Sequence, residues 1–145
     1  MAYDLDRFLP AQEESYDRAL DEIAQGAKLS HWMWYIFPQI AGLGSSSLSK
    51  LYAIANESEA RVYLAHLILG PRLIECVEAL LRIDDRSARQ IFGSPDDLKM
   101  RSCATLFEVV SPEGSVFTRL LEKYFKGERD PKTTEILAMG VGYAE

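Results

Sequence analysis

Apolar residues recur three and four positions apart along most of the chain, the spacing that places them on one face of an α-helix. Longer helices are predicted over residues 11–25, 71–81, 96–110 and 116–125. Shorter helices are predicted over residues 31–37 and 87–92, from Ser58 and from Pro131. No run alternates for long enough to demand a sheet. We therefore predict an all-α or mainly α fold, a single compact orthogonal multi-helix domain of about six to eight helices over residues 1–145.

The residues at the predicted helix ends support these bounds. Side-chain oxygens suited to capping a first turn belong to Ser30, Ser58 and Asp96. Pro71 suits the first position of a helix, and glycines that readily end helices are Gly26, Gly93 and Gly127. The glycine- and serine-rich residues 42–47 are predicted to form an open loop, and residues 140–145 a frayed tail.

Composition and charge narrow the class of protein. The 145 residues are 48% hydrophobic, enough to bury a core without metals or disulfides. The net charge of −6 favours solubility and argues against binding a nucleic acid polymer, which needs a basic face. The apolar stretches fall far short of the roughly 20 residues that cross a bilayer, and the acidic start at Met1–Asp6 is unlike a secretory signal. We expect a cytoplasmic protein with no membrane partner.

The two cysteines and two histidines give no metal-binding pattern. Cys76 and Cys103 fall on apolar faces of predicted helices, which favours buried free thiols, although their number alone would allow a disulfide. His66 lies within an apolar helix and is predicted to be structural. Their spacing matches no zinc motif, so we expect no metal and no cofactor.

The segment from Ser30 to Gln39 is the main candidate for a site, because it holds four of the chain's fifteen aromatic residues, Trp32, Trp34, Tyr35 and Phe37. In a helix these side chains would divide between two faces, so the segment is either buried all round or has one face in the core and one lining a pocket. A buried strand is the alternative for so short a run. An aromatic wall of this kind stacks on flat rings such as nucleobases.

Polar residues at both ends of this segment add candidate chemistry. His31 can act as a general acid or base, or it can hold a structural hydrogen bond; Gln39 can bind a ligand. The loop with Gly42 and Gly44 has the composition of a phosphate-binding loop, although it lacks the Walker and dinucleotide motifs and also suits a plain surface turn.

A cluster of charged residues at positions 96–102 is a second candidate for a site. Asp97 and Arg101 are four residues apart and can form an ion pair on the helix surface. Alternatively, this helix aims Lys99 and Arg101 toward a cleft. No motif for covalent catalysis is present.

These motifs resemble the family known as domain of unknown function 1810. The residues that carry the resemblance are Asp6-Arg7-Phe8, Ala11-Gln12, residues 30–40 (SHWMWYIFPQI), Gly42-Leu43-Gly44, Tyr52-Ala53-Ile54, residues 69–73 (LGPRL), residues 92–99 (FGSPDDLK) and Arg101-Ser102. They span nearly the whole chain, and the HWMW…FPQ string is highly specific. The resemblance implies a small, mainly helical, stand-alone bacterial protein with no established activity.

The Asp-Asp-x-Lys-x-Arg string at residues 96–101, with Phe107 and the later run over 120–137, is also similar to the family that handles NAD and ADP-ribose derivatives. That similarity implies a helical fold that binds a ribose-phosphate and cleaves an N-glycosidic bond. It would place Lys99 and Arg101 against phosphate and Trp32 or Trp34 against a base. Asp97 would then stabilise an oxocarbenium-like centre.

Three hypotheses about function follow. The first is a small-molecule-binding protein, or an enzyme, for a nucleotide-like or ADP-ribose-type phosphorylated ligand, with His31 and Asp97 as catalytic residues. Its ligand-binding residues would be Trp32, Trp34, Gln39, Gly42, Gly44, Lys99 and Arg101. The second is a non-catalytic interaction module, a monomer or homodimer that uses the aromatic segment as its contact surface. In the third, that segment is only core and any site lies elsewhere.

Overall fold

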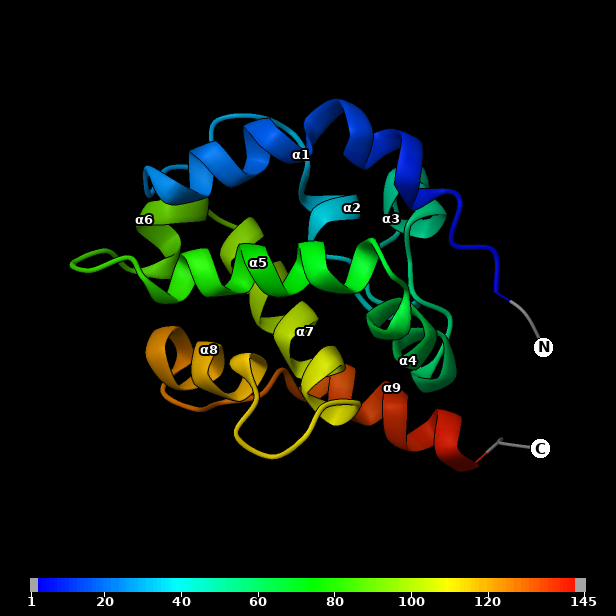
Figure 1. Cartoon of the computed structure of the whole chain (residues 1–145). Helices are drawn as coiled ribbons and strands as arrows, with labels where there is room; N and C mark the ends of the chain where they lie inside the picture. Colours follow the sequence, from blue (N-terminus) through cyan, green and yellow to red (C-terminus); the bar gives the residue numbers. More distant parts are fainter. Residues whose placement is uncertain (1–2, 143–145) are drawn as a thin grey trace.

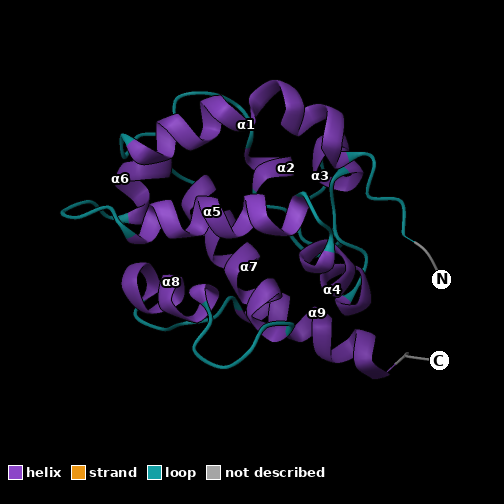
Figure 2. Cartoon of the chain, in the orientation of Figure 1, coloured by secondary structure: helices purple, strands orange, loops and turns teal. Residues whose placement is uncertain are grey.

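The computed structural model describes residues 3–142, with side chains described for residues 3–139. Nine helices lie in this range: α1 (Phe8–Ala24), α2 (Met33–Ile36), α3 (Ser47–Leu51), α4 (Glu57–Ala65), α5 (Leu69–Leu81), α6 (Ala88–Phe92), α7 (Asp96–Val109), α8 (Val116–Phe125) and α9 (Pro131–Gly142). Figures 1 and 2 show these helices joined by loops, with no strand among the described residues. The prediction of a mainly α, single-domain fold is confirmed.

The helices pack around α5 and α7. Helix α5 crosses the molecule with α1 on one side and α8 on the other, while α7 contacts α4, α6, α8 and α9 (Figure 1). The buried side chains from these helices form one continuous hydrophobic cluster. Such a cluster is what the three- and four-residue apolar spacing of the sequence produces when the helices meet.

The starts of α4, α5 and α7 differ from those predicted. Helix α4 begins one residue before Ser58, and its N-cap is Asn56, whose Oδ1 accepts a hydrogen bond from the Glu59 N–H at 2.9 Å. Pro71 is the third residue of α5 and not the first. Asp96 is the first helical residue of α7, and its carboxylate forms an ion pair with Lys28 at 2.9 Å in place of a cap.

The aromatic segment and the loop that follows it also differ from prediction. Helix α2 covers only Met33–Ile36, so the predicted helix over residues 31–37 is real but short, and the strand alternative is wrong. The predicted open loop leads into α3, a short helix that the sequence analysis did not predict. It forms because the Ser46 hydroxyl accepts a hydrogen bond from the Ser49 N–H at 3.1 Å and caps its first turn.

The junction between α4 and α5 explains His66 and Gly70. The Nδ1 atom of His66 accepts hydrogen bonds from the N–H groups of Ile68 and Leu69, at 3.1 and 3.2 Å, and so caps the start of α5. The structural role predicted for His66 is confirmed. At Gly70, α5 approaches the end of α4 so closely that a Cβ atom would lie 2.1 Å from the Leu64 carbonyl oxygen.

Both thiols are buried and free, as predicted. Burial raises the pKa of Cys76 to about 12 and the pKa of Cys103 well above its usual value of 9.0, because the charged thiolate is poorly solvated in the core.

We therefore expect neither thiol of the folded protein to react with a disulfide reagent such as DTNB at about pH 8, whereas both react at once in urea. Absorbance of the released thiolate measures this directly. Rapid reaction of either thiol in the native protein, with circular dichroism unchanged, would contradict the prediction.

Within residues 3–142, no helix combines the length and the apolar character that a membrane crossing requires. Helix α9 continues to Gly142, and residues 143–145 lie outside the described range, so the tail predicted over 140–145 stays a prediction.

Candidate functional site

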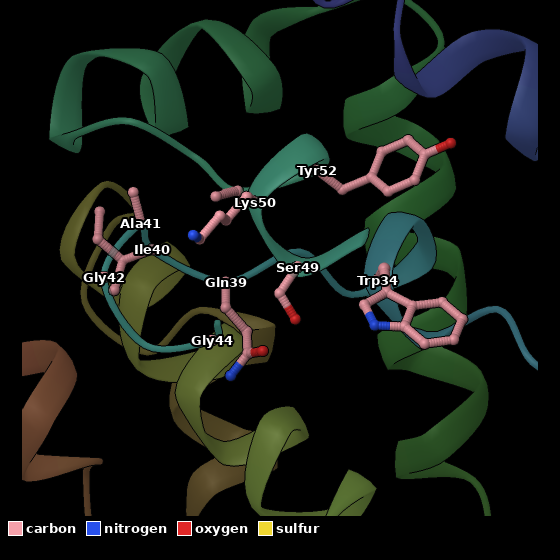
Figure 3. A pocket seen from close by; sticks show the side chains of 10 residues that line it. Trp34, Gln39, Ile40, Ala41, Gly42, Gly44, Ser49, Lys50 and Tyr52 are labelled. Atoms are coloured by element: carbon pink, nitrogen blue, oxygen red, sulfur yellow. The ribbon is translucent and has the colours of Figure 1, made fainter. Parts of the chain in front are cut away.

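A small pocket lies between Trp34 and the segment formed by residues 39–53, called here the pocket loop. Its volume is about 140 Å³. The residues that line it are Trp34, Gln39, Ile40, Ala41, Gly42, Gly44, Ser49, Lys50, Tyr52 and Ala53 (Figure 3). Four residues selected from the sequence, Trp34, Gln39, Gly42 and Gly44, therefore meet at one place.

The ends of the pocket loop are held together by backbone hydrogen bonds. Ile40 and Ile54 form an isolated parallel bridge, in which the Ala41 N–H donates to the Ile54 carbonyl and the Ile54 N–H donates to the Gln39 carbonyl, both at 2.8 Å. Arg7 also holds the second end of the loop, because its guanidinium donates hydrogen bonds to the carbonyls of Leu51, at 2.9 Å, and of Ala53, at 2.7 Å. The loop is thus fixed at its base, although all of α3 lies at the surface.

The two glycines of the pocket loop are required by its geometry. Gly42 has a φ of +103°, a conformation that residues with a side chain rarely adopt. A Cβ atom on Gly44 would lie only 2.5 Å from the Ser49 Cβ, so Gly44 lets α3 fold back against the loop. Both glycines form part of the pocket wall, and neither position needs a bound phosphate to explain it.

Trp34 is the aromatic residue of the Ser30–Gln39 segment that lines the pocket, and Lys99 lies beside it. The Lys99 ammonium sits 5.8 Å from the centre of the Trp34 ring. Its carboxylate partner is Asp96, 3.6 Å away on the same helix. The sequence hypothesis directs Lys99 toward a cleft. The structure places its ammonium beside Trp34, but Lys99 is not one of the residues that line the pocket, so its role in binding stays a prediction.

Trp32 is a core residue, which corrects its predicted role as a ligand-stacking residue. Its side chain is completely buried, with the ring packed near Phe37 and Phe92. The indole Nε1–H donates to Glu22 Oε1 at 2.9 Å, and the Lys28 ammonium lies 5.1 Å from the ring centre. No ligand can reach this ring without opening the core.

Glu22 explains why the chain turns inward at Trp32. This carboxylate is only 7% exposed, and it accepts hydrogen bonds from the N–H groups of Leu29 and Ser30, at 2.8 and 3.0 Å. It also accepts one from the Ser30 hydroxyl, at 2.6 Å, so Ser30 binds Glu22 and does not cap α2 as predicted. Burial alone would raise the pKa of Glu22, but the hydrogen bonds from Ser30, Leu29 and Trp32 outweigh it and lower the pKa to about 2.

The remaining predicted site residues do not line the pocket. His31 is exposed in the turn before α2. Asp97 accepts a hydrogen bond from the Leu98 N–H at 2.9 Å, within the first turn of α7. Arg101 does not pair with Asp97; it donates to the Arg129 carbonyl at 3.0 Å, toward the segment between α8 and α9. The predicted catalytic pair is therefore not assembled at this pocket.

Of the lining residues that sequence reasoning missed, three have side chains that can form hydrogen bonds, Ser49, Lys50 and Tyr52. They lie ten residues or more beyond the aromatic segment and return to it only because α3 forms. The signal that could have found them is the Ser46-x-x-Ser49 pair, a helix start within what was predicted to be an open loop.

Comparisons with known proteins agree on the family. The crystal structure of the conserved hypothetical protein Rv1873 from Mycobacterium tuberculosis is similar to this chain, with 45% sequence identity and a TM-score of 0.92. The similarity covers 94% of this chain and 97% of that one. No curated protein matches the chain. These comparisons do not show a relation to the family that handles NAD and ADP-ribose derivatives, so that similarity stays a prediction.

The family described as "Protein of unknown function (DUF1810)" matches residues 2–137, nearly the whole chain. This is the family that the HWMW…FPQ string indicated. The chain belongs to the DUF1810 family.

Proposed function

We propose that the protein binds a small anionic ligand that contains a flat ring, with the ring against Trp34 in the pocket. Nucleotide-like and ADP-ribose-type phosphorylated compounds are the first class to test. The observation that carries the proposal is the position of Trp34: its ring lines the pocket with Gln39, while Trp32 and Phe37 of the same segment are buried.

The charges around the pocket favour an anion. Lys50 lines it, and Lys99 lies next to Trp34. No Asp or Glu is among the described residues that line it, so an anion there meets attraction without direct repulsion. Stacking of a base on an aromatic side chain contributes about 1–3 kcal/mol in single-strand binders, which makes Trp34 the main expected contact.

The proposal covers binding and not N-glycosidic cleavage. That reaction needs a carboxylate, or another acid or base, beside the scissile bond. His31 and Asp97, the residues predicted for this role, are outside the set that lines the pocket. The proposal therefore assigns them no catalytic step.

Most apolar residues of the aromatic segment are buried. Trp32, Met33, Ile36 and Phe37 are each no more than 2% exposed, whereas Trp34 and Tyr35 are partly exposed. No observation favours the interaction-module hypothesis, and the choice between monomer and homodimer stays a prediction.

The test is a thermal-shift and calorimetric screen with ADP-ribose, NAD and AMP on the wild type and a Trp34→Ala variant. We expect at least one of these ligands to stabilise the wild type and to bind the variant about tenfold or more weakly, because the variant lacks the stacking surface. Trp34→Phe, which keeps a flat ring, should retain most of the affinity.

Lys126→Gln serves as a control, because it removes a partly exposed cation at the end of α8 that does not line the pocket, and it should change nothing. Equal affinity of wild type and Trp34→Ala for every ligand that binds would place binding elsewhere and contradict the proposal.

A further inference from the structure

The size of the pocket limits its occupant. Pockets that enclose drug-sized ligands usually measure about 300–1,000 Å³. This pocket measures about 140 Å³, and Gly44 and Ser49, which lie close together, both line it. It therefore has room for one ring with a small substituent, and any larger ligand would extend beyond it.

The pocket has few polar side chains, one of them charged and the others neutral. Lys50 is exposed and forms no ion pair with any described carboxylate, so its ammonium is available to a ligand. Gln39 and Ser49 supply neutral hydrogen-bonding groups. Tyr52 directs its ring toward Phe8 and Tyr35, at 5.7 and 5.3 Å between ring centres, and so belongs more to the core than to the pocket.

These groups are arranged in an order along the pocket. In Figure 3 the Trp34 indole and the Lys50 ammonium lie on opposite sides of Gln39 and Ser49. The remaining walls are apolar or backbone, from Ile40, Ala41 and Ala53. A ligand that satisfies all of them needs a flat apolar ring at one end and a negative charge at the other.

We infer that the pocket selects a single-ring planar carboxylic acid, whose ring lies against Trp34 and whose carboxylate faces Lys50. This inference rests on the proposed function and narrows its ligand class from flat-ringed anions in general to one-ring acids of the benzoate type. Among the nucleotides it favours NAD, which can place its single nicotinamide ring against Trp34, over AMP and ADP-ribose, whose only base, adenine, has two fused rings. Trp34 selects a planar ring, Lys50 selects a negative charge, and the small volume of the pocket limits the size of the ligand.

The experiment is an NMR titration of the ¹⁵N-labelled full chain with four probes that separate these three features. Benzoate has the full set. Benzamide keeps the ring without the charge, cyclohexanecarboxylate keeps the charge without the flat ring, and 2-naphthoate adds a second ring. We expect benzoate to bind with the lowest Kd, about tenfold or more below each of the other three, with shifts centred on the pocket loop.

Two variants assign the contacts. Lys50→Gln should weaken benzoate about fivefold or more and leave benzamide unchanged, because the amide probe carries no charge. Trp34→Ala should weaken both probes. Lys126→Gln, which removes a partly exposed lysine that does not line the pocket, should bind like the wild type.

The possible failures can be told apart. Equal binding of benzoate and benzamide, equal binding of 2-naphthoate, or no effect of Lys50→Gln would overturn the inference. Binding of AMP or ADP-ribose that depends on Trp34, with no binding of benzoate, would also overturn it while leaving the proposed function standing. Absence of binding by every probe and nucleotide would overturn both.

Discussion

The Glu22→Gln variant is expected to lose about 3 kcal/mol of unfolding free energy at pH 7, and the loss should shrink as the pH falls toward 2. The Glu22 carboxylate accepts hydrogen bonds from two backbone N–H groups, a hydroxyl and the Trp32 indole. A glutamine turns its own N–H₂ group toward some of these donors, which leaves them unpaired inside the protein.

The direction of the pH dependence follows from the lowered pKa. The pKa of Glu22 falls from its usual 4.5 to about 2 in the folded protein. The ionised carboxylate therefore stabilises the folded state fully above about pH 5, and this stabilisation is lost as the pH falls from 4.5 toward 2. Urea unfolding of the wild type and of Glu22→Gln at about pH 7, 4 and 2.5 gives the difference between their unfolding free energies. Because both proteins share all other carboxylates, the effects of those groups cancel in this difference.

Glu14→Gln provides the control, because Glu14 is exposed on the same helix and should give a difference near zero at every pH. If the loss for Glu22→Gln were the same at pH 7 and pH 2.5, the stabilising role of its charge would be disproved.

Gly70→Ala is expected to destabilise the protein by about 3 kcal/mol, even though alanine favours helices by about 1 kcal/mol over glycine. The added methyl group would lie 2.1 Å from the carbonyl oxygen and 2.9 Å from the carbonyl carbon of Leu64. Both are backbone atoms, so no side-chain rotation relieves the overlap. Helices α4 and α5 must separate, which disturbs their buried contact.

Thermal and urea unfolding of Gly70→Ala measure this loss. Gly114→Ala is the matched comparison: its added methyl would meet no atom within 4 Å, and only its φ of +77° opposes alanine. That strain should cost about 1 kcal/mol. A Gly70→Ala protein as stable as Gly114→Ala would show that the two helices tolerate the separation.

The helical fold could be predicted from the sequence because most helices carry a full apolar stripe. In α5, Leu73, Cys76, Val77 and Leu80 are all buried, as their spacing predicts. The ends were less predictable, because serine, aspartate and asparagine compete to cap a helix. Asn56 caps α4 although Ser58 lies two residues later, and the choice depends on which backbone angles the tertiary structure imposes.

Only part of the candidate site could be predicted, because sequence patterns show which neighbouring residues lie together but not which distant residues contact them. Trp34, Gln39, Gly42 and Gly44 meet because they lie within eleven residues of one another. Which tryptophan faces the core depends on Glu22, a residue of α1 whose hydrogen bond fixes Trp32 inside. Helical periodicity within the aromatic segment carries no information about a partner ten residues away.

The charged residues of α7 show the same limit. Periodicity allows Asp97 and Arg101 to pair, but it does not reveal that the Arg129 carbonyl accepts the Arg101 hydrogen bond from a loop 28 residues away. Lys99 lies beside Trp34 but does not line the pocket. Its contact with Trp34 depends on how α7 packs, which the ion pair between Lys28 and Asp96 helps to fix.

The bridge between Ile40 and Ile54 divides the pocket loop into buried ends that stabilise the fold and an exposed middle that does not. These two buried residues and Arg7 hold both ends of the pocket loop, whereas residues 44–48 between them are all exposed. Substitutions at Ser45, Ser47 and Leu48 leave these buried contacts intact, so we expect them to change the free energy of unfolding little. The pocket loop should therefore tolerate sequence change at these exposed positions better than at its two ends.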